Sequence, residues 1–409
     1  MKLADCEVFV VGNPPPRMGG NYFIFVKLLT ACGIRGYGEV YAATFGPQVV
    51  ADMVRDVFER HFLDQDPHRI EHLWRATYGS GYTLRPDASL VGVLSGLEIA
   101  CWDIVGKAAD RPIYDLLGGR CRDRVRSYTY LYPEPGPEGR ADWDVYTSPD
   151  AKAVYEDPDR AAERAVAYVA QGFTALKFDP AGPYTVYDGR QPDLEALERS
   201  TLFCRRLREA VGTRADLLFG THGQFSTAGA KRLARRLEPF EPLWFEEPVP
   251  PEMPEQMAEV ARSTCVPIST GERLVTKYEF ARVLALGAAS ILQPALGRVG
   301  GILEAKKIAA MAEAHYAQMA PHLYAGPIEG AANVQLATCT PNFLILESIE
   351  RWGGFHAALL NTKMRWEDGY VIPPDQPGLG VELNEEVARA HPYTGTALHL
   401  GMEEAPREP

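Results

Sequence analysis

From residue 125 onward the sequence alternates between short apolar runs and longer helical segments, and this alternation limits the possible folds more than any other feature. Eight apolar runs have the length of buried strands: Val125–Leu131, Ala175–Phe178, Leu217–Phe219, Leu243–Phe245, Pro267–Ser269, Ser290–Gln293, Gln318–Ala320 and Phe343–Leu346. Most are separated by helical patterns, for example Leu194–Ala210, Ala228–Leu237 and Gly301–His315. Repeated strand–helix units predict a parallel sheet, and eight units in about 250 residues are typical of a (β/α)8 TIM-type barrel.

The sequence before and after this region has a different texture. Alternating runs at Cys6–Val11 and Phe23–Leu29 precede a helical pattern at Ser95–Gly106, and strands followed by helices predict an α+β domain. We therefore expect an α+β domain at 1–124, a barrel at 125–372 and a tail at 373–409 that packs on the first domain. The segment Pro133–Asp157, rich in Pro, Gly and Tyr, is interpreted as an insertion after the first barrel strand.

Composition excludes several classes of partner. The 409 residues carry a formal net charge of −12, which argues against nucleic acids and anionic membranes as partners. The seven cysteines are scattered, odd in number and form no CxxC pair, so we expect reduced thiols and a cytoplasmic protein. We expect neither a signal peptide nor a membrane span, since the first residues lack a basic start with an apolar run and no apolar stretch of about 18 residues occurs.

Two of the predicted strands are followed closely by a glutamate. Glu246 follows the run Leu243–Phe245, and Glu272 follows Pro267–Ser269 after two further residues. In a closed parallel barrel the strand ends converge on one face, so these two carboxylates should point to the same place. Paired carboxylates without Cys or His partners at zinc-like spacing suit a hard cation such as Mg²⁺. The sequence therefore predicts a metal-assisted enzyme.

Several motifs, in order along the chain, resemble those of the mandelate racemase branch of the enolase superfamily. The longest of them is Ser95–Gly119, and the shorter ones are Trp244–Pro248, Gly271-Glu272, Gln293-Pro294, Gly297–Gly301 and Pro321-His322. The resemblance covers nearly the whole chain. It implies an α+β capping domain over a modified (β/α)8 barrel, and a homo-oligomer between a dimer and an octamer.

The resemblance also implies a reaction class. Mg²⁺ (or Mn²⁺) holds the carboxylate of a small-molecule substrate while a base removes the proton from the adjacent carbon. The resulting enediolate is dianionic, so positive charge is needed where negative charge develops. Glu347, at the end of the eighth predicted strand, matches the carboxylic acid that hydrogen-bonds the substrate carboxylate in this family. To donate that bond it must be protonated, which burial among other carboxylates favours.

The chain departs from the family pattern at three strand ends. The third strand usually ends in a metal-ligating Asp, but here Gly220 takes that place and His222 follows two residues later. The second strand usually ends in Lys-x-Lys, but here it reads Lys177-Phe-Asp179. The sixth strand usually carries an Asp that pairs with the seventh-strand His, but Ala295 occupies that position.

The first two departures can compensate each other, because the second and third strands are neighbours. We favour a metal site of Asp179, Glu246 and Glu272, which keeps three carboxylates. A rival arrangement places His222 on the metal, although Mg²⁺ tolerates imidazole less readily than Zn²⁺ or Mn²⁺ does. Taken alone, Asp179 before Pro180 could simply cap a turn, and His222 could be a core histidine.

Acid–base chemistry is then expected from Lys177 and His322 on opposite sides of the substrate, with His222 as a third group. Burial and a nearby cation lower the pKa of a lysine towards the range a base needs. Without an acidic partner, His322 should be a proton donor rather than a strong base. Glu247, beside Glu246, is interpreted as a structural acid.

The family resemblance, together with a lone histidine donor (His322) and a lysine base (Lys177), favours dehydration of a sugar acid to a 2-keto-3-deoxy acid. One alternative is a racemase, epimerase or cycloisomerase, in which Lys177 and His322 exchange protons across one carbon. Another is a degenerate, non-catalytic binding protein, suggested by Gly220 and Ala295. Specificity is expected in loops that reach over the barrel mouth: Asn13–Tyr22, Tyr41–Phe45 and the insertion up to Tyr155.

Overall fold

The barrel forms as predicted, with parallel strands that follow one another in sequence order. The computed structural model describes residues 1–42, 44–82, 84–134, 144–145 and 148–406. Its barrel strands are β4 (Val125–Tyr130), β5 (Ala175–Phe178), β6 (Asp216–Phe219), β7 (Trp244–Glu246), β8 (Ile268–Thr270), β9 (Ile291–Leu292), β10 (Gln318–Met319) and β11 (Leu346–Ser348). Each pairs in parallel with the next from β4 to β10, and β11 returns to β4. Between β10 and β11, Met319 bridges Phe343 and its carbonyl accepts the Leu344 N–H at 2.8 Å, so pairing continues around the barrel.

The barrel interior is a packed core, to which most strands contribute one buried side chain. This cluster consists of Tyr128, Ala175, Leu218, Trp244, Ile291, Ala320 and Ile345. The Tyr128 and Trp244 rings meet edge to face, with centroids 5.4 Å apart. A filled interior leaves chemistry only at the two ends of the barrel.

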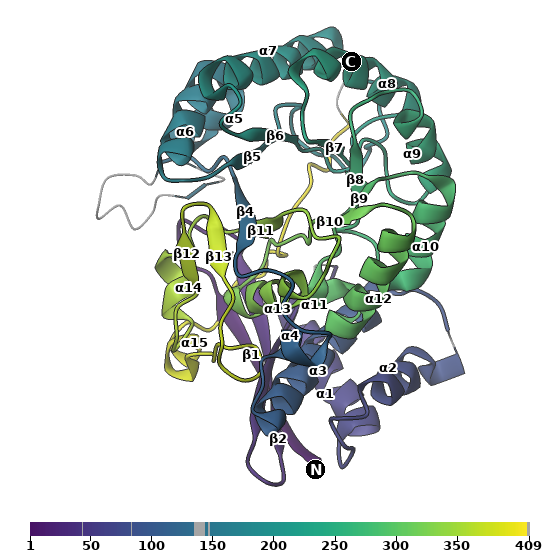
Figure 1. Cartoon of the computed structure of the whole chain (residues 1–409), viewed down its shortest axis with the longest axis vertical. Helices are drawn as coiled ribbons and strands as arrows, with labels where there is room; N and C mark the ends of the chain where they lie inside the picture. Colours follow the sequence, from purple (N-terminus) through teal and green to yellow (C-terminus); the bar gives the residue numbers. More distant parts are fainter. Residues whose placement is uncertain (43, 83, 135–143, 146–147, 407–409) are drawn as a thin grey trace.

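Helices surround the barrel on its outer side (Figure 1). They are α5 (Pro149–Glu156), α6 (Pro158–Ala170), α7 (Leu194–Val211), α8 (Thr227–Leu237), α9 (Pro254–Ala261), α10 (Thr276–Leu286), α11 (Leu296–Val299), α12 (Gly301–Ala314) and α13 (Pro327–Thr338), with a short 3₁₀ turn at Glu238–Phe240. Side-chain caps fix where several of them begin: Asp157, Asp193 and Ser226 each accept a backbone N–H from the first turn of α6, α7 and α8.

The first part of the chain is the predicted α+β domain. Strands β1 (Leu3–Gly12), β2 (Tyr22–Thr30) and β3 (Arg35–Val40) form an antiparallel sheet. The helices are α1 (Pro47–Val57), α2 (Ile70–Tyr78), α3 (Ala88–Ala109) and α4 (Ile113–Leu116), with a π-helical turn at Phe58–Phe62 and a 3₁₀ turn at Ser80–Tyr82. Gly38 lets α3 approach the sheet, since a Cβ there would lie 1.9 Å from the Gly96 carbonyl oxygen.

Helix α3 is long and apolar enough to cross a membrane, which the sequence alone had not suggested. In the fold, 72% of its most apolar window is buried. It packs against β3 and against α11 of the barrel. These contacts are those of a core helix that joins the two parts of the molecule.

Directly before the predicted tail, a hairpin extends the barrel sheet. Strands β12 (Arg365–Glu367) and β13 (Tyr370–Ile372) pair antiparallel, and β13 adds to β4. Helices α14 (Gly354–Ala358) and α15 (Glu385–Ala390) flank this hairpin in the sequence. The tail then contacts the first domain, where Pro392 bridges Val11 of β1. Its last described residues run back to the barrel, which the sequence did not predict: Glu403 bridges Thr185 in the loop after β5.

Candidate active site

All the predicted site residues lie at the carboxyl ends of the barrel strands. Lys177 is the third residue of β5 and Asp179 follows this strand. Glu246 ends β7, and Glu347 lies within β11. The others follow their strands directly: His222 after β6, Glu272 after β8 and His322 after β10. The strand register therefore brings them to one end of the barrel, which we call the mouth.

Glu246 has hydrogen-bond donors on both carboxylate oxygens. Its Oε1 accepts from the Lys177 ammonium at 2.7 Å. Its Oε2 accepts from the Gln293 amide at 2.9 Å and from the Trp244 indole N–H at 3.0 Å. The Glu246 side chain is 1% exposed, so this ion pair is fully desolvated and depends on these bonds.

Lys177 lies between two carboxylates. Its Nζ is 2.7 Å from Glu246 and 3.7 Å from Glu347. Burial lowers the pKa of Lys177, but Glu246, Glu347 and Glu272 together outweigh burial and raise this pKa above its ordinary value. The lysine is therefore charged while all three glutamates are ionised.

Glu272 faces both histidines of the mouth. Its Oε1 lies 3.6 Å from His222 Nε2, and its Oε2 lies 3.3 Å from His322 Nε2. Burial raises the pKa of Glu272, but His222, His322 and Lys177 outweigh it and hold this pKa far below its usual range. Its Oε2 accepts no hydrogen bond from the described residues, so a buried anionic oxygen is open to a ligand.

His222 lies between Glu272 and Asp179. Its Nδ1 is 3.8 Å from Asp179 Oδ2, too far for a hydrogen bond, and the ring packs edge-on against Tyr184 with centroids 4.5 Å apart. Burial lowers the pKa of His222, yet Glu272 and Asp179 raise it to about 9. Burial raises the pKa of Asp179 above its usual value, against the opposing influence of His222.

The donor atoms of this cluster fit a divalent cation. One ligand atom each from His222, Glu246 and Glu272 lie within 4.8 Å of one another, which is the spacing of a shared metal. This group corresponds to the rival arrangement of the sequence analysis. Asp179 is not in the group, although it neighbours Gly220: a Cβ at Gly220 would lie 3.7 Å from the Asp179 Cβ and 3.2 Å from the Lys177 Cε.

His322 and Glu347 complete the mouth. Burial lowers the pKa of His322 to about 3, so the imidazole is neutral near pH 7. Its ring stacks on Tyr41 of the first domain, with centroids 5.8 Å apart and planes at 19°. Burial raises the pKa of Glu347 to about 7, the direction that a proton-donating carboxylic acid requires. Glu347 accepts the backbone N–H of Leu323 at 2.9 Å.

Comparison with protein families identifies the chain. Residues 7–118 match the N-terminal domain of mandelate racemase and muconate lactonizing enzyme, and residues 160–387 match the enolase C-terminal domain-like family. The chain belongs to the mandelate racemase/muconate lactonizing enzyme family. This confirms the resemblance seen in the sequence and the barrel with a capping domain that it implied.

Members of the mandelate racemase/muconate lactonizing enzyme family match along the whole chain. A candidate mandelate racemase/muconate lactonizing enzyme of Labrenzia alexandrii DFL-11 has a solved structure with 66% identity, a TM-score of 0.95 and coverage of 100% of both chains. The D-gluconate/D-galactonate dehydratase of Picrophilus torridus is 33% identical, covering 96% of this chain and 95% of its own. The D-xylonate dehydratase of Haloferax volcanii is also 33% identical, covering 97% and 91%.

Some residues of this mandelate racemase-like mouth were missed by the sequence analysis. Gln293 was read only as part of a motif, yet it donates to Glu246. Tyr41 was placed in a loop and Tyr184 was not singled out, yet each packs on a site histidine. Glu247 accepts from Arg273 at 3.0 Å, the contact of a structural acid, while burial raises the pKa of Glu247 to about 7.

The loops expected to set specificity meet at the mouth in part. Arg17, in the loop Asn13–Tyr22, pairs with Asp144 of the insertion at 3.3 Å. The Tyr41–Phe45 segment contributes Tyr41, and residue 43 lies outside the described residues, as do insertion residues 135–143 and 146–147.

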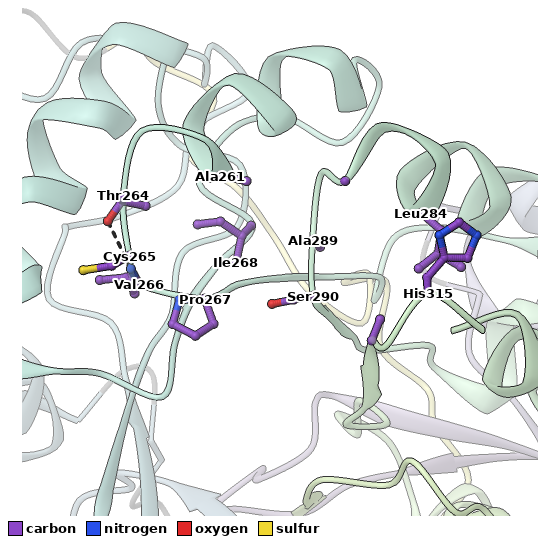
Figure 2. Close-up of a pocket in the computed structure, with 12 residues that line it drawn as sticks. Ala261, Thr264, Cys265, Val266, Pro267, Ile268, Leu284, Ala289, Ser290 and His315 are labelled. Atoms are coloured by element: carbon purple, nitrogen blue, oxygen red, sulfur yellow. Dashed lines mark hydrogen bonds between the residues drawn. The ribbon is translucent and has the colours of Figure 1, made fainter. Parts of the chain in front are cut away.

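A large cavity lies at the opposite end of the barrel (Figure 2). It has a volume of about 490 Å³ and is lined by residues that include Cys265, Ile268, Leu284, Ser290 and His315. Ile268 begins β8, whereas Glu272 follows the other end of that strand. This cavity is therefore separate from the mouth, and no carboxylate is among the described residues that line it.

Proposed function

We propose that this chain is a Mg²⁺-dependent dehydratase that converts a sugar acid into a 2-keto-3-deoxy acid. One observation supports this most: Lys177 and His322 approach the same carboxyl group, Glu347, at 3.7 Å and 4.0 Å. Two groups that can move a proton thus flank the place where the family binds a substrate carboxylate. The relatives named as D-gluconate, D-galactonate and D-xylonate dehydratases suggest the substrate class.

In this proposal Glu246, Glu272 and His222 hold the cation. Asp179 lies behind His222, 3.8 Å from its Nδ1, where a small movement would let it accept the Nδ1–H of a metal-bound imidazole. When bound, the cation supplies positive charge to the substrate carboxylate and to the enediolate. The alternative of Asp179 as the third ligand makes a different prediction for metal affinity.

Lys177 is proposed as the base that removes the α-proton. Lys177 is charged while Glu246, Glu347 and Glu272 are ionised, so it must first lose a proton; a cation held by Glu246 and Glu272 would offset their charge and let burial favour the neutral amine. His322 is proposed as the donor that delivers a proton to the departing β-hydroxyl. Its ring must first take up a proton, which the adjacent Glu272 carboxylate favours, and it then donates as the imidazolium. Glu347, protonated, would then donate a hydrogen bond to the substrate carboxylate. Each group acts on an atom within one small, water-poor space.

Racemisation or epimerisation is the second candidate, because the same two groups could face opposite sides of one carbon. Both reactions begin by breaking the α-C–H bond, so they differ only in the fate of the intermediate. Dehydration releases the β-hydroxyl as water and leaves a keto acid. Racemisation returns a proton, so in deuterated water the substrate carbon acquires deuterium.

The function is tested by incubating the protein and Mg²⁺ with D-gluconate, D-galactonate, D-xylonate and a wider set of sugar acids. Semicarbazide detects 2-keto products, and proton NMR in deuterated water detects exchange at the α-carbon. We expect keto-acid formation that Lys177→Ala and His322→Asn each reduce by about 10²-fold or more. Exchange without keto acid would replace dehydration by racemisation. If neither keto acid nor exchange is detected and no Mg²⁺ binds, the chain is a non-catalytic binding protein.

The ligand set is tested separately by isothermal titration with Mg²⁺ and Mn²⁺. His222→Asn should weaken metal binding more than Asp179→Asn does, because a direct ligand is lost rather than its partner. The reverse order would assign Asp179 to the metal. Glu247→Gln serves as the control, since Glu247 is bound to Arg273 beside the cluster.

A further inference from the structure

The end of the chain lies across the mouth. Residues 391–406, which we call the strap, follow the segment matched by the family C-terminal domain, which ends at residue 387. The strap leaves β1, where Gly12 N–H donates to the His391 carbonyl at 2.8 Å. In Figure 1 this last, yellow stretch of chain crosses the barrel. Two further attachments hold it there.

The first attachment is His399, which is 4% exposed. Its Nδ1 lies 3.0 Å from the Tyr22 carbonyl oxygen and its Nε2 lies 2.9 Å from the Tyr324 carbonyl oxygen. The ring thus joins a strand of the first domain to the loop after β10. Gly20 has φ +106° and a Cβ there would lie 2.1 Å from the His399 ring, so glycine is required for this close approach.

Through Tyr41, His399 reaches a proposed catalytic residue. The His399 ring meets Tyr41 edge-on, with centroids 5.3 Å apart, and Tyr41 stacks on His322. Arg298 covers the Tyr41 ring at 4.1 Å. Because Ala295 supplies no carboxylate, His322 Nδ1 has no hydrogen-bond partner among the described residues. The orientation of the His322 ring therefore depends on packing against Tyr41 and on the Glu272 carboxylate, 3.3 Å from its Nε2.

The second attachment leads to the other histidine. Glu403 N–H donates to the Tyr184 carbonyl at 2.9 Å, and Val186 N–H donates to the Glu403 carbonyl at 2.9 Å. This short parallel pairing fixes the loop after β5. Tyr184, in that loop, packs edge-on against His222. Each attachment of the strap thus lies behind an aromatic ring that contacts one histidine of the mouth.

We propose that two points of the strap support the active site from outside, with His399 as a positioning residue that holds Tyr41 against His322. The backbone of Glu403 does the same for Tyr184 and His222. This inference rests on the proposed function for the role of the histidines. The positioning role explains how His322 stays aligned although the sixth-strand acid is absent. Tyr41 of the first domain stacks on His322, and the strap holds Tyr41 in place. Small displacements at such a site have large kinetic effects.

The kinetic test compares His399→Ala, His399→Phe and the matched control Leu400→Ala, whose side chain is 44% exposed in the same strap. We expect His399→Ala to lower kcat by about tenfold or more with KM changed less than threefold, and His399→Phe to recover part of the loss because it keeps the edge contact with Tyr41. Leu400→Ala should match the wild type. In a double-mutant cycle, His399→Ala added to Tyr41→Ala should cost little more than Tyr41→Ala alone. A kcat for His399→Ala within twofold of the wild type, or additive losses, would overturn the proposal.

A second readout needs no substrate. NMR of protein labelled at the histidine ring Cε1 gives one signal per histidine, and the His322 signal is assigned by its loss in His322→Asn. The chemical shift of the His322 ring proton then reports the stacking of this ring on Tyr41. This shift should change in folded His399→Ala and stay in place in Leu400→Ala. An unchanged shift would contradict the positioning role. If the wild type turns over no sugar acid, the proposed function fails, while this spectrum still decides the role of the strap.

Discussion

The two ends of this barrel are built from the same strands but have opposite character. At the mouth, Lys177, Glu246, Glu272 and Glu347 are buried within ion-pair distance of one another or of a histidine. At the other end lies the cavity of about 490 Å³, with alanine, valine and leucine among its lining residues. No carboxylate is among the described residues that line the cavity, whereas the mouth is built from buried charged side chains.

This difference shows that a pocket in this fold need not carry the charged groups that chemistry requires. Strand β8 serves both ends: Ile268 at its start lines the cavity, and Glu272, just past its end, faces the two histidines. Strand direction alone decides which end becomes functional, because loops after parallel strands carry the variable side chains. Substitutions at the mouth should therefore reduce rate, and substitutions at the cavity should reduce stability.

The largest effect is expected for Glu272→Gln at the mouth. Removing this charge takes away a proposed metal ligand, so kcat/KM should fall by about 10³-fold or more, equal to about 4 kcal/mol of transition-state stabilisation. Stability should fall as well, because His222, His322 and Lys177 hold the pKa of Glu272 far below its usual range, so its charged form stabilises the fold. Steady-state kinetics and thermal unfolding of the metal-free protein measure both quantities.

Glu247→Gln is the matched control for that variant. Glu247 is the neighbouring buried acid and is bound to Arg273 at 2.9 Å, so its loss should affect stability more and rate less than the loss of Glu272 does. If Glu247→Gln abolishes activity while Glu272→Gln spares it, the mouth as described is wrong.

At the cavity end the expected effect is smaller and of the other kind. Leu284→Ala, in α10, should lower the free energy of unfolding by about 2 kcal/mol, the low end of the range for such changes, because the side chain already borders empty space. The kcat per folded molecule should stay at the wild-type value. Urea unfolding and active-site titration test this, with exposed Leu202→Ala of α7 as the neutral control. A large loss of kcat would show that the two ends are coupled.

The barrel and its two glutamates were predictable from sequence because they depend on local pattern. Strand β5 has the predicted bounds, and Glu246 and Glu272 reach the same mouth because successive parallel strands put their ends together. The apolar run and the acid after it are both visible in one short stretch of sequence.

Contacts between distant segments were not predictable in this way. Tyr41 reaches His322 from another domain, and His399 reaches Tyr41 from the end of the chain. No periodicity links these positions, since their spacing is set by how the first domain sits on the barrel. The choice between Asp179 and His222 was open for the same reason: it depends on side-chain directions at two neighbouring strand ends.

The smallest effect on stability is expected for His356, a buried residue beside the mouth that should not affect the rate. His356 is 4% exposed, and its Nε2 donates to the Ala325 carbonyl at 3.1 Å. Burial lowers the pKa of His356 to about 4, from about 6.5 in the unfolded chain. His356→Gln can keep a donor near this carbonyl but does not titrate.

The sign follows from proton counts. Between pH 6.5 and 5.5 the unfolded chain takes up a proton at this histidine and the folded chain does not, so acidification favours unfolding. The wild type should therefore lose about 1 kcal/mol more of its unfolding free energy over this interval than His356→Gln does. Urea unfolding at both pH values measures the difference, while kcat at pH 7 should be equal in the two proteins. Parallel pH dependences would mean that the pKa of His356 is the same in the folded and the unfolded chain, and an altered kcat would extend the mouth to include this residue.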